Sequence, residues 1–155
     1  MGIFMKLKAL VVGLFALVLA ACDAFVTGES VAKFPVTVNA DGSYSPVKLA
    51  LGPEMNPVAL NISHLYTGAQ PTGPKFNDYK AALTLNGQPI STGAFNVTDS
   101  STPEATVSAP SAKNHVMTVS VREVGDYELT IVRNGPAHVS LTKPEIELRK
   151  NIKSH

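Results

Sequence analysis

The chain has 155 residues, of which 45% are hydrophobic and only 16% are charged, and its formal net charge is +1. This length suits one domain with short additional segments. The single cysteine excludes an internal disulfide framework and any metal cage built from several cysteines. Lysine and arginine are scattered rather than clustered, so the chain lacks the basic face that nucleic-acid binding needs, and we expect no nucleic-acid partner.

The first 21 residues have the layout of a secretory signal peptide. Lys6 and Lys8 precede an uncharged, mostly apolar run from Ala9 to Ala21, and both Met1 and Met5 are possible starts. As a helix, this run is about 20 Å long, short of the roughly 30 Å hydrocarbon core of a bilayer. We therefore expect residues 1–21 to be removed as a signal peptide rather than kept as a membrane span.

The stretch Leu19-Ala20-Ala21-Cys22 follows the apolar run and resembles the lipobox of bacterial lipoproteins. The resemblance implies that Cys22 receives a diacylglyceryl group and becomes the acylated amino terminus. Two or three acyl chains, at about 0.8 kcal/mol per buried methylene, give durable anchoring. Asp23 implies retention at the inner membrane, as in enterobacterial lipoproteins, with the outer membrane as the alternative. The expected location is thus a cell membrane, with the protein lipid-anchored and facing the periplasm.

The mature chain is predicted to be all-β. We expect a lipidated tether at 22–33, one β-sandwich domain at 34–150 and a flexible tail at 151–155. Val58, Leu60 and Ile62 share one face of their run while polar residues take the other, as a two-layer antiparallel sandwich requires. Eight such runs are predicted as strands: 34–38, 46–51, 57–64, 79–85, 88–97, 116–122, 127–133 and 137–148.

Turn residues support this division. Asn86-Gly87 and Asn134-Gly135 each stand between alternating runs, and Asp41-Gly42 marks another turn. In the last run the apolar residues stand at odd positions before Lys143-Pro144 (Val139, Leu141) and at even positions after it (Ile146, Leu148). This change predicts a bulge or a strand break at Lys143-Pro144.

The stretch 121–135, VREVGDYELTIVRNG, resembles the E–F–G region of immunoglobulin-like domains. In that comparison Gly125-Asp126-Tyr127 forms the tyrosine corner, and Leu129 stands where antibody domains carry a cysteine. The predicted fold is therefore an antiparallel immunoglobulin-like β-sandwich that follows a cleaved lipoprotein signal peptide.

No catalytic motif is present in the sequence. It contains no G-x-S-x-G elbow, Walker loop, H-E-x-x-H zinc motif or dinucleotide-binding fingerprint. Nucleophilic catalysis needs a base beside the nucleophile, and none of the histidines stands in such a setting. We therefore expect a protein that is not an enzyme and that holds no cofactor.

One group of residues suggests copper as an alternative. His115 and Met117 stand two residues apart, so their side chains share one face of a strand. His64 ends another strand and has the same alternation as the inward residues Val58, Leu60 and Ile62. If these strands pair as B and E of an immunoglobulin-like domain, the two histidines become cross-strand neighbours. Imidazole and thioether are ligands that Cu(I) favours. The simpler interpretation is that the histidines cap the core and Met117 fills it.

Two long loops, 65–78 and 98–114, are rich in small residues, glycine or proline, and such loops are usually functional or disordered. In the predicted topology they meet the connection 133–136 at one end of the sandwich. There we expect a partner-binding surface, or else plain solvated loops, formed by Tyr66, Lys75, Phe76, Lys113, Arg133 and Asn134.

The leading functional hypothesis is a non-catalytic binding or accessory module of a protein complex in the cell envelope. The alternative is a periplasmic copper-binding lipoprotein that uses His64, His115 and Met117.

Overall fold

A computed structural model describes residues 27–67, 75–98 and 111–153 of the protein. The described chain consists of β-strands and one short 3-10 turn, η1 (Pro53–Met55). The strands are β1 (Glu29–Pro35), β2 (Val47–Leu51), β3 (Val58–Tyr66), β4 (Phe76–Leu85), β5 (Gln88–Thr98), β6 (Ser111–Val119), β7 (Gly125–Arg133) and β8 (Leu141–Lys150).

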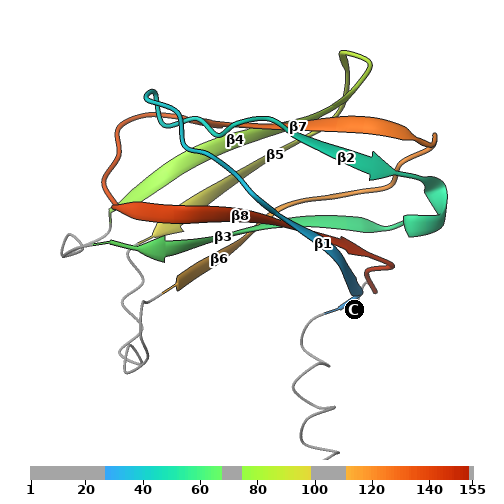
Figure 1. Cartoon of the computed structure of the whole chain (residues 1–155), viewed down its shortest axis with the longest axis horizontal. Helices are drawn as coiled ribbons and strands as arrows, with labels where there is room; N and C mark the ends of the chain where they lie inside the picture. The colour runs from blue at the N-terminus through green and yellow to red at the C-terminus, as the bar shows by residue number, and fades with distance from the viewer. Residues whose placement is uncertain (1–26, 68–74, 99–110, 154–155) are drawn as a thin grey trace, which may run out of the picture.

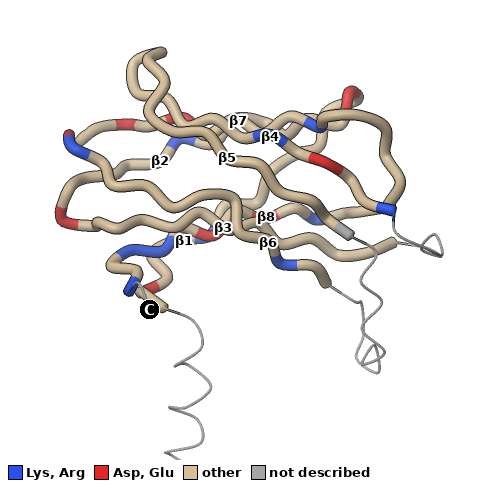
Figure 2. The backbone as a smooth tube through the Cα atoms, turned by 180° about the vertical axis from the view of Figure 1, so that it is seen from behind, with Lys and Arg blue, Asp and Glu red and all other residues tan. Residues whose placement is uncertain are grey.

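The strands form two four-stranded antiparallel sheets that stack face to face (Figure 1). One sheet has the order β1-β8-β3-β6 and the other the order β2-β7-β4-β5. Figure 2 shows the same two layers from behind, with positive and negative residues interspersed along them. The predicted antiparallel β-sandwich is confirmed.

The strand order within the sheets is that of a jelly roll. β3 pairs with β6 and β4 with β7, as strands B and E and strands C and F do in immunoglobulin-like domains. β8, however, lies between β1 and β3 instead of beside β7. The first strand thus pairs with the last, the second with the seventh, the third with the sixth and the fourth with the fifth. Period-two alternation predicts an inward face for each strand but not its neighbours, so this difference was invisible in the sequence.

The core lies between the sheets and contains the inward residues that the alternation predicts. Leu60, Leu83 and Ile146 are fully buried, and Tyr127 is almost so. The Tyr127 hydroxyl donates a hydrogen bond of 2.8 Å to the backbone carbonyl of Glu123, which is the bond of a tyrosine corner. This part of the resemblance to immunoglobulin-like domains is therefore confirmed.

The described strands have four register shifts, and two of them, in β8 and β6, keep the inward faces in phase. Lys143 adopts a left-handed backbone conformation (φ 49°), and the register between β3 and β8 shifts at this position, as predicted. A second bulge, in β6, was not predicted: Leu60 pairs with Met117 but Asn61 pairs with His115, so Val116 is the extra residue. Val116 and Met117 are both buried and His115 is exposed.

The domain is longer at both ends than predicted. β1 begins at Glu29 rather than at residue 34, and Arg149 donates hydrogen bonds to the carbonyls of Thr27 (3.1 Å) and Gly28 (2.8 Å). Beyond β8, the backbone N–H groups of Asn151 and Ile152 bond to carbonyls next to η1. The predicted tether 22–33 and tail 151–155 are therefore both too long. β1 is an edge strand in which half-buried and exposed residues alternate only from Val31 onward, so its first residues carry no such pattern.

The sandwich has two distinct ends (Figure 1). The start of β1, the end of β8 and the turns β2–β3, β4–β5 and β6–β7 lie at one end, which we call the terminal end. The other end, the loop end, contains the strand ends that flank the connections β1–β2, β3–β4, β5–β6 and β7–β8. The tight Asn86-Gly87 turn, with both residues at positive φ as predicted, closes the β4–β5 hairpin at the terminal end.

One side of the sandwich closes where β5 and β6, edge strands of different sheets, come into contact. Gly93 of β5 lies against the backbone of Val116: a Cβ atom at Gly93 would collide with the carbonyl oxygen of Val116 and lie 3.3 Å from the Cβ of Met117. The absence of a side chain at Gly93 therefore permits this contact.

Gly93→Ala should destabilise the protein by about 1–3 kcal/mol, because the added methyl group forces the two edge strands apart. Urea unfolding followed by circular dichroism measures the change. Ala94→Val is the matched control, since Ala94 is exposed on the opposite face of β5 and should tolerate the larger side chain. Equal stability of Gly93→Ala and the wild type would contradict the close approach.

Candidate functional site

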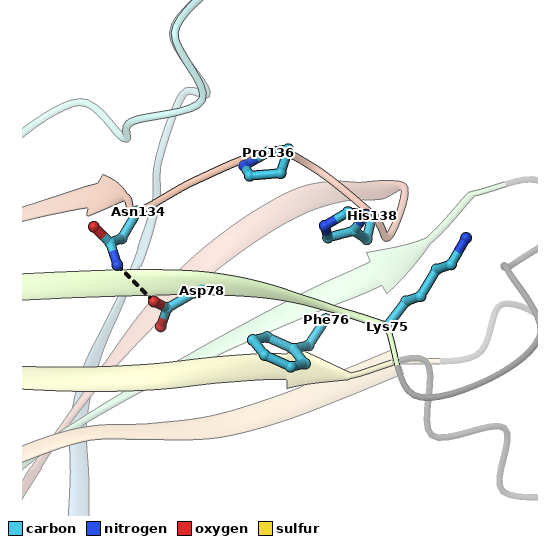
Figure 3. A pocket seen from close by; sticks show the side chains of 6 residues that line it. All are labelled: Lys75, Phe76, Asp78, Asn134, Pro136 and His138. Atoms are coloured by element: carbon cyan, nitrogen blue, oxygen red, sulfur yellow. Dashed lines mark hydrogen bonds between the residues drawn. The ribbon is translucent and has the colours of Figure 1, made fainter.

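The loop end contains two cavities on either side of the first residues of β4. The Phe76 pocket, about 210 Å³ in volume, is lined by Lys75, Phe76, Asp78, Asn134, Pro136 and His138 (Figure 3). The Arg133 pocket, about 300 Å³ in volume, includes Asn77, Tyr79, Arg133, Ala137 and Val139 in its lining. Side chains of an extended chain point alternately to opposite sides, so neighbouring residues of β4 and of the β7–β8 connection line different pockets.

Asn77 holds the β7–β8 connection in place between the two pockets. Its side chain is only 3% exposed. Its amide nitrogen donates to the carbonyl of Val139 (2.9 Å), and its amide oxygen accepts from the backbone N–H groups of His138 (2.6 Å) and Val139 (2.9 Å). One buried side chain therefore fixes the walls of both pockets. The sequence prediction missed this role because it assigned Asn77 to a loop, although Asn77 has the same inward phase as Tyr79.

The Phe76 pocket combines an exposed aromatic ring with a hydrogen-bonded carboxylate. Phe76 is 43% exposed. The Asn134 side chain donates to Oδ2 of Asp78 at 2.7 Å, shown by the dashed line in Figure 3. The side-chain nitrogen of Asn96 faces Asp78 and donates to Oδ1 of Asp78 at 2.8 Å. Both carboxylate oxygens are thus held by neutral amides, so the charge of Asp78 has a fixed position beside the ring.

Stacked aromatic rings lie beneath the Arg133 pocket. The ring centroids of Tyr44 and Tyr79 are 5.5 Å apart, and those of Tyr79 and Phe95 are 5.0 Å apart. The Tyr44 hydroxyl makes a 2.7 Å hydrogen bond with Nε2 of His64, which is only 1% exposed. Burial raises the pKa of the Tyr44 hydroxyl above its ordinary value and lowers the pKa of His64 to about 4. The imidazole is therefore neutral at physiological pH.

The three residues of the copper hypothesis do not come together. His64 pairs with Ala112 and points into the core, whereas His115 pairs with Asn61 on the outer face. There Nδ1 of His115 bonds to the side-chain oxygen of Asn61 and Nε2 to the hydroxyl of Thr118, both at 3.1 Å. The expectation that the two histidines are cross-strand neighbours is wrong, because the register places Ala112 opposite His64 and the bulge at Val116 turns His115 to the outer face. In the described ranges, no group of three or more His, Cys, Asp or Glu residues is arranged to hold a metal ion.

The six predicted partner-binding residues separate into groups. Lys75, Phe76 and Asn134 line the Phe76 pocket together with His138, which is exposed. Arg133 lines the other pocket, and Tyr66 is partly buried against the core at the end of β3.

Lys113 is directed elsewhere. Its ammonium group lies 2.6 Å from Glu147, which also pairs with Arg149 at 2.8 Å. Hydrogen bonds from these two cations hold the pKa of Glu147 down at about 2, against the opposing effect of burial. Glu147 is buried among these partners. Cys22 and Asp23 lie outside the described residues.

The sequence matches no protein-family model, and no curated protein is significantly similar to it. Across residues 27–67, 75–98 and 111–153, no helix is long and apolar enough to span a bilayer.

Protonation of His64 should link stability to pH. The folded state has a pKa of about 4 and the ordinary value is 6.5, so the unfolded chain binds the proton first as the pH falls. The stabilisation is complete above the ordinary pKa and is lost on acidification towards the folded-state pKa. The free energy of unfolding should therefore fall by about 3 kcal/mol over this window, as measured by urea unfolding at a series of pH values.

His64→Phe keeps an aromatic ring beside Tyr44 and Tyr79 but has no nitrogen to protonate, so most of this pH dependence should disappear. His138→Gln, which removes an exposed histidine, is the control and should retain it. An unchanged pH dependence in His64→Phe would exclude His64 as its source.

Proposed function

We propose that this protein is a membrane-anchored lipoprotein of the cell envelope and acts as a non-catalytic binding or accessory module. Cys22 provides the lipid anchor, the sandwich provides a rigid frame, and the loop end contacts a protein partner. The observation that carries the proposal is the position of the Phe76 pocket, which lies at the end of the sandwich opposite the point where the chain joins it.

The short spacer supports this orientation. Four residues, Asp23 to Val26, separate Cys22 from Thr27, and even a fully extended chain spans only about 17 Å over this distance. From Thr27 onward the chain is held by Arg149, so the spacer has no further slack. An acylated Cys22 therefore keeps the terminal end close to the bilayer. The ten residues of β8, at about 3.3 Å each, separate the two ends of the sandwich by about 33 Å, so in the proposed orientation the loop end faces away from the bilayer.

The residues at the loop end suit contact with a protein. Phe76 presents an exposed ring and Lys75 a cation. Asn134, bonded to Asp78, and His138, whose backbone N–H donates to the Asn77 side chain, add polar groups. Aromatic side chains that anchor in a partner pocket, surrounded by polar groups, provide most of the binding energy in many interfaces.

The net charge of the mature part is close to zero, because 2 of the 13 basic residues, Lys6 and Lys8, precede Cys22. Electrostatic attraction to anionic lipid therefore contributes little, and the lipid must provide the anchoring.

The anchor is tested with Cys22→Ala. In the wild type we expect the amino-terminal peptide to begin at Cys22 and to carry the mass of its acyl chains, with the protein in the membrane fraction. Cys22→Ala should lose both the acyl mass and the membrane association. Mass spectrometry that finds an uncleaved terminus with an unmodified cysteine would disprove the lipoprotein assignment.

The contact surface is tested with a photoreactive phenylalanine analogue placed at Phe76 or at Val124. Both positions are exposed and apolar, and Val124, which is 80% exposed, belongs to the β6–β7 turn at the terminal end. In intact cells, position 76 should give a discrete crosslinked species that weakens severalfold when Lys75→Glu is added. Crosslinking from position 124 alone, or equal crosslinking from both positions, would contradict the assignment of the loop end.

A further inference from the structure

Arg133 lies in the wall of a cavity and forms no salt bridge with any residue that the structure describes. It ends β7 and is half-buried, and it is the one charged residue among those that line the Arg133 pocket. Its Nε donates to the carbonyl of Gly135 at 3.0 Å. Among the residues that the structure describes, neither terminal amino group of Arg133 has a hydrogen-bond or carboxylate partner. Two parallel N–H donors thus remain available to a ligand.

The position of the guanidinium group is fixed by Gly42. The guanidinium lies so close to Gly42 that a Cβ atom there would collide with Nη1 and Cζ of Arg133. Gly42 has φ +83°, and the turn around it is closed by bonds between Asn39 and Ser43 and by the Asp41 carboxylate, which accepts from Ser43. The Asp41 carboxylate is thus hydrogen-bonded chiefly to Ser43, and the charge of Arg133 makes a smaller contribution to lowering its pKa.

The rest of the cavity divides into a polar and an apolar part. Tyr44 and Tyr79 contribute aromatic side chains with hydroxyl groups, and the charge of Arg133 acts on the Tyr44 hydroxyl. Aliphatic groups provide the other part of the lining: Val38, Ala137, Val139 and Leu141. A volume of about 300 Å³ is at the small end of the range for ligand sites.

We propose that the Arg133 pocket binds a small organic carboxylate with a short apolar tail. The two free amino groups of Arg133 match the two oxygens of a carboxylate, which is the geometry that guanidinium groups recognise best. The aliphatic lining receives the tail. The Asn77 bonds to the β7–β8 connection hold the cavity open before the ligand arrives, which reduces the ordering cost of binding. This site is distinct from the Phe76 surface, and its existence does not depend on lipidation.

Sodium pentanoate is a suitable probe, and pentanamide is its neutral counterpart of nearly equal shape. We expect pentanoate to cause saturable NMR shifts in the backbone amides of Gly42, Gly135 and Val139 of the full chain in detergent micelles. Pentanamide should bind at least about tenfold more weakly, because it lacks the charge that Arg133 recognises.

Arg133→Gln should reduce pentanoate affinity to that of pentanamide, and Arg133→Lys, which keeps the charge but not the paired donors, should give an intermediate affinity. Arg122→Gln is the matched control: Arg122 is exposed at the terminal end, and its loss should change nothing. Equal binding of the two probes, unchanged affinity in a folded Arg133→Gln protein, or shifts that do not saturate would each overturn the proposal. The same titration on Cys22→Ala should give the same result, which separates this test from that of the lipid anchor.

Discussion

All strands must bury one face at the same interface between the two sheets, and the other features of the structure follow from this constraint. Where the chain departs from strict alternation, a bulge restores the inward face. Lys143 takes a left-handed conformation in β8, and Val116 is accommodated as an extra residue in β6. The burial of several large apolar side chains outweighs the cost of each local irregularity. The bulge in β6 also removes His115 from the core face, so the position of a polar side chain is set by the packing of its apolar neighbours.

The winding of the strands gives the two ends of the molecule different contents. Since β1 pairs with β8, the two termini of the domain meet at one end, where Arg149 joins the incoming chain to the sheet. The strand ends that flank the connections β1–β2, β3–β4, β5–β6 and β7–β8 lie at the opposite end, and each of these connections joins one sheet to the other. In the proposed function, the lipid anchor and the contact surface therefore lie at different ends of the sandwich. This division is the structural basis for the proposed orientation on a membrane.

Buried polar groups give the loop end its shape. Asn77 satisfies two backbone N–H groups and a carbonyl of the β7–β8 connection, which would otherwise be unpaired in a dry environment. His64 and Tyr44 bond to each other inside the stacked rings, and the imidazole stays neutral because burial disfavours its charged form. These bonds explain how loops at the end of a sandwich form defined cavities. They also place a cation, Arg133, beside a polar and an aliphatic wall.

The sequence by itself determined the strands, their inward residues and most of their turns, because alternation and turn chemistry are local properties. Val58, Leu60 and Ile62 are inward as predicted, Tyr127 makes its corner bond, and the change of phase falls at Lys143. It also indicated Phe76, Arg133 and Asn134 as residues of the loop end. Only the tertiary structure decided that β8 inserts between β1 and β3, that Val116 bulges, and that Asn77 joins two segments far apart in the chain. Each of these depends on which strands become neighbours, and a pattern with a period of two residues is the same for every choice of neighbour.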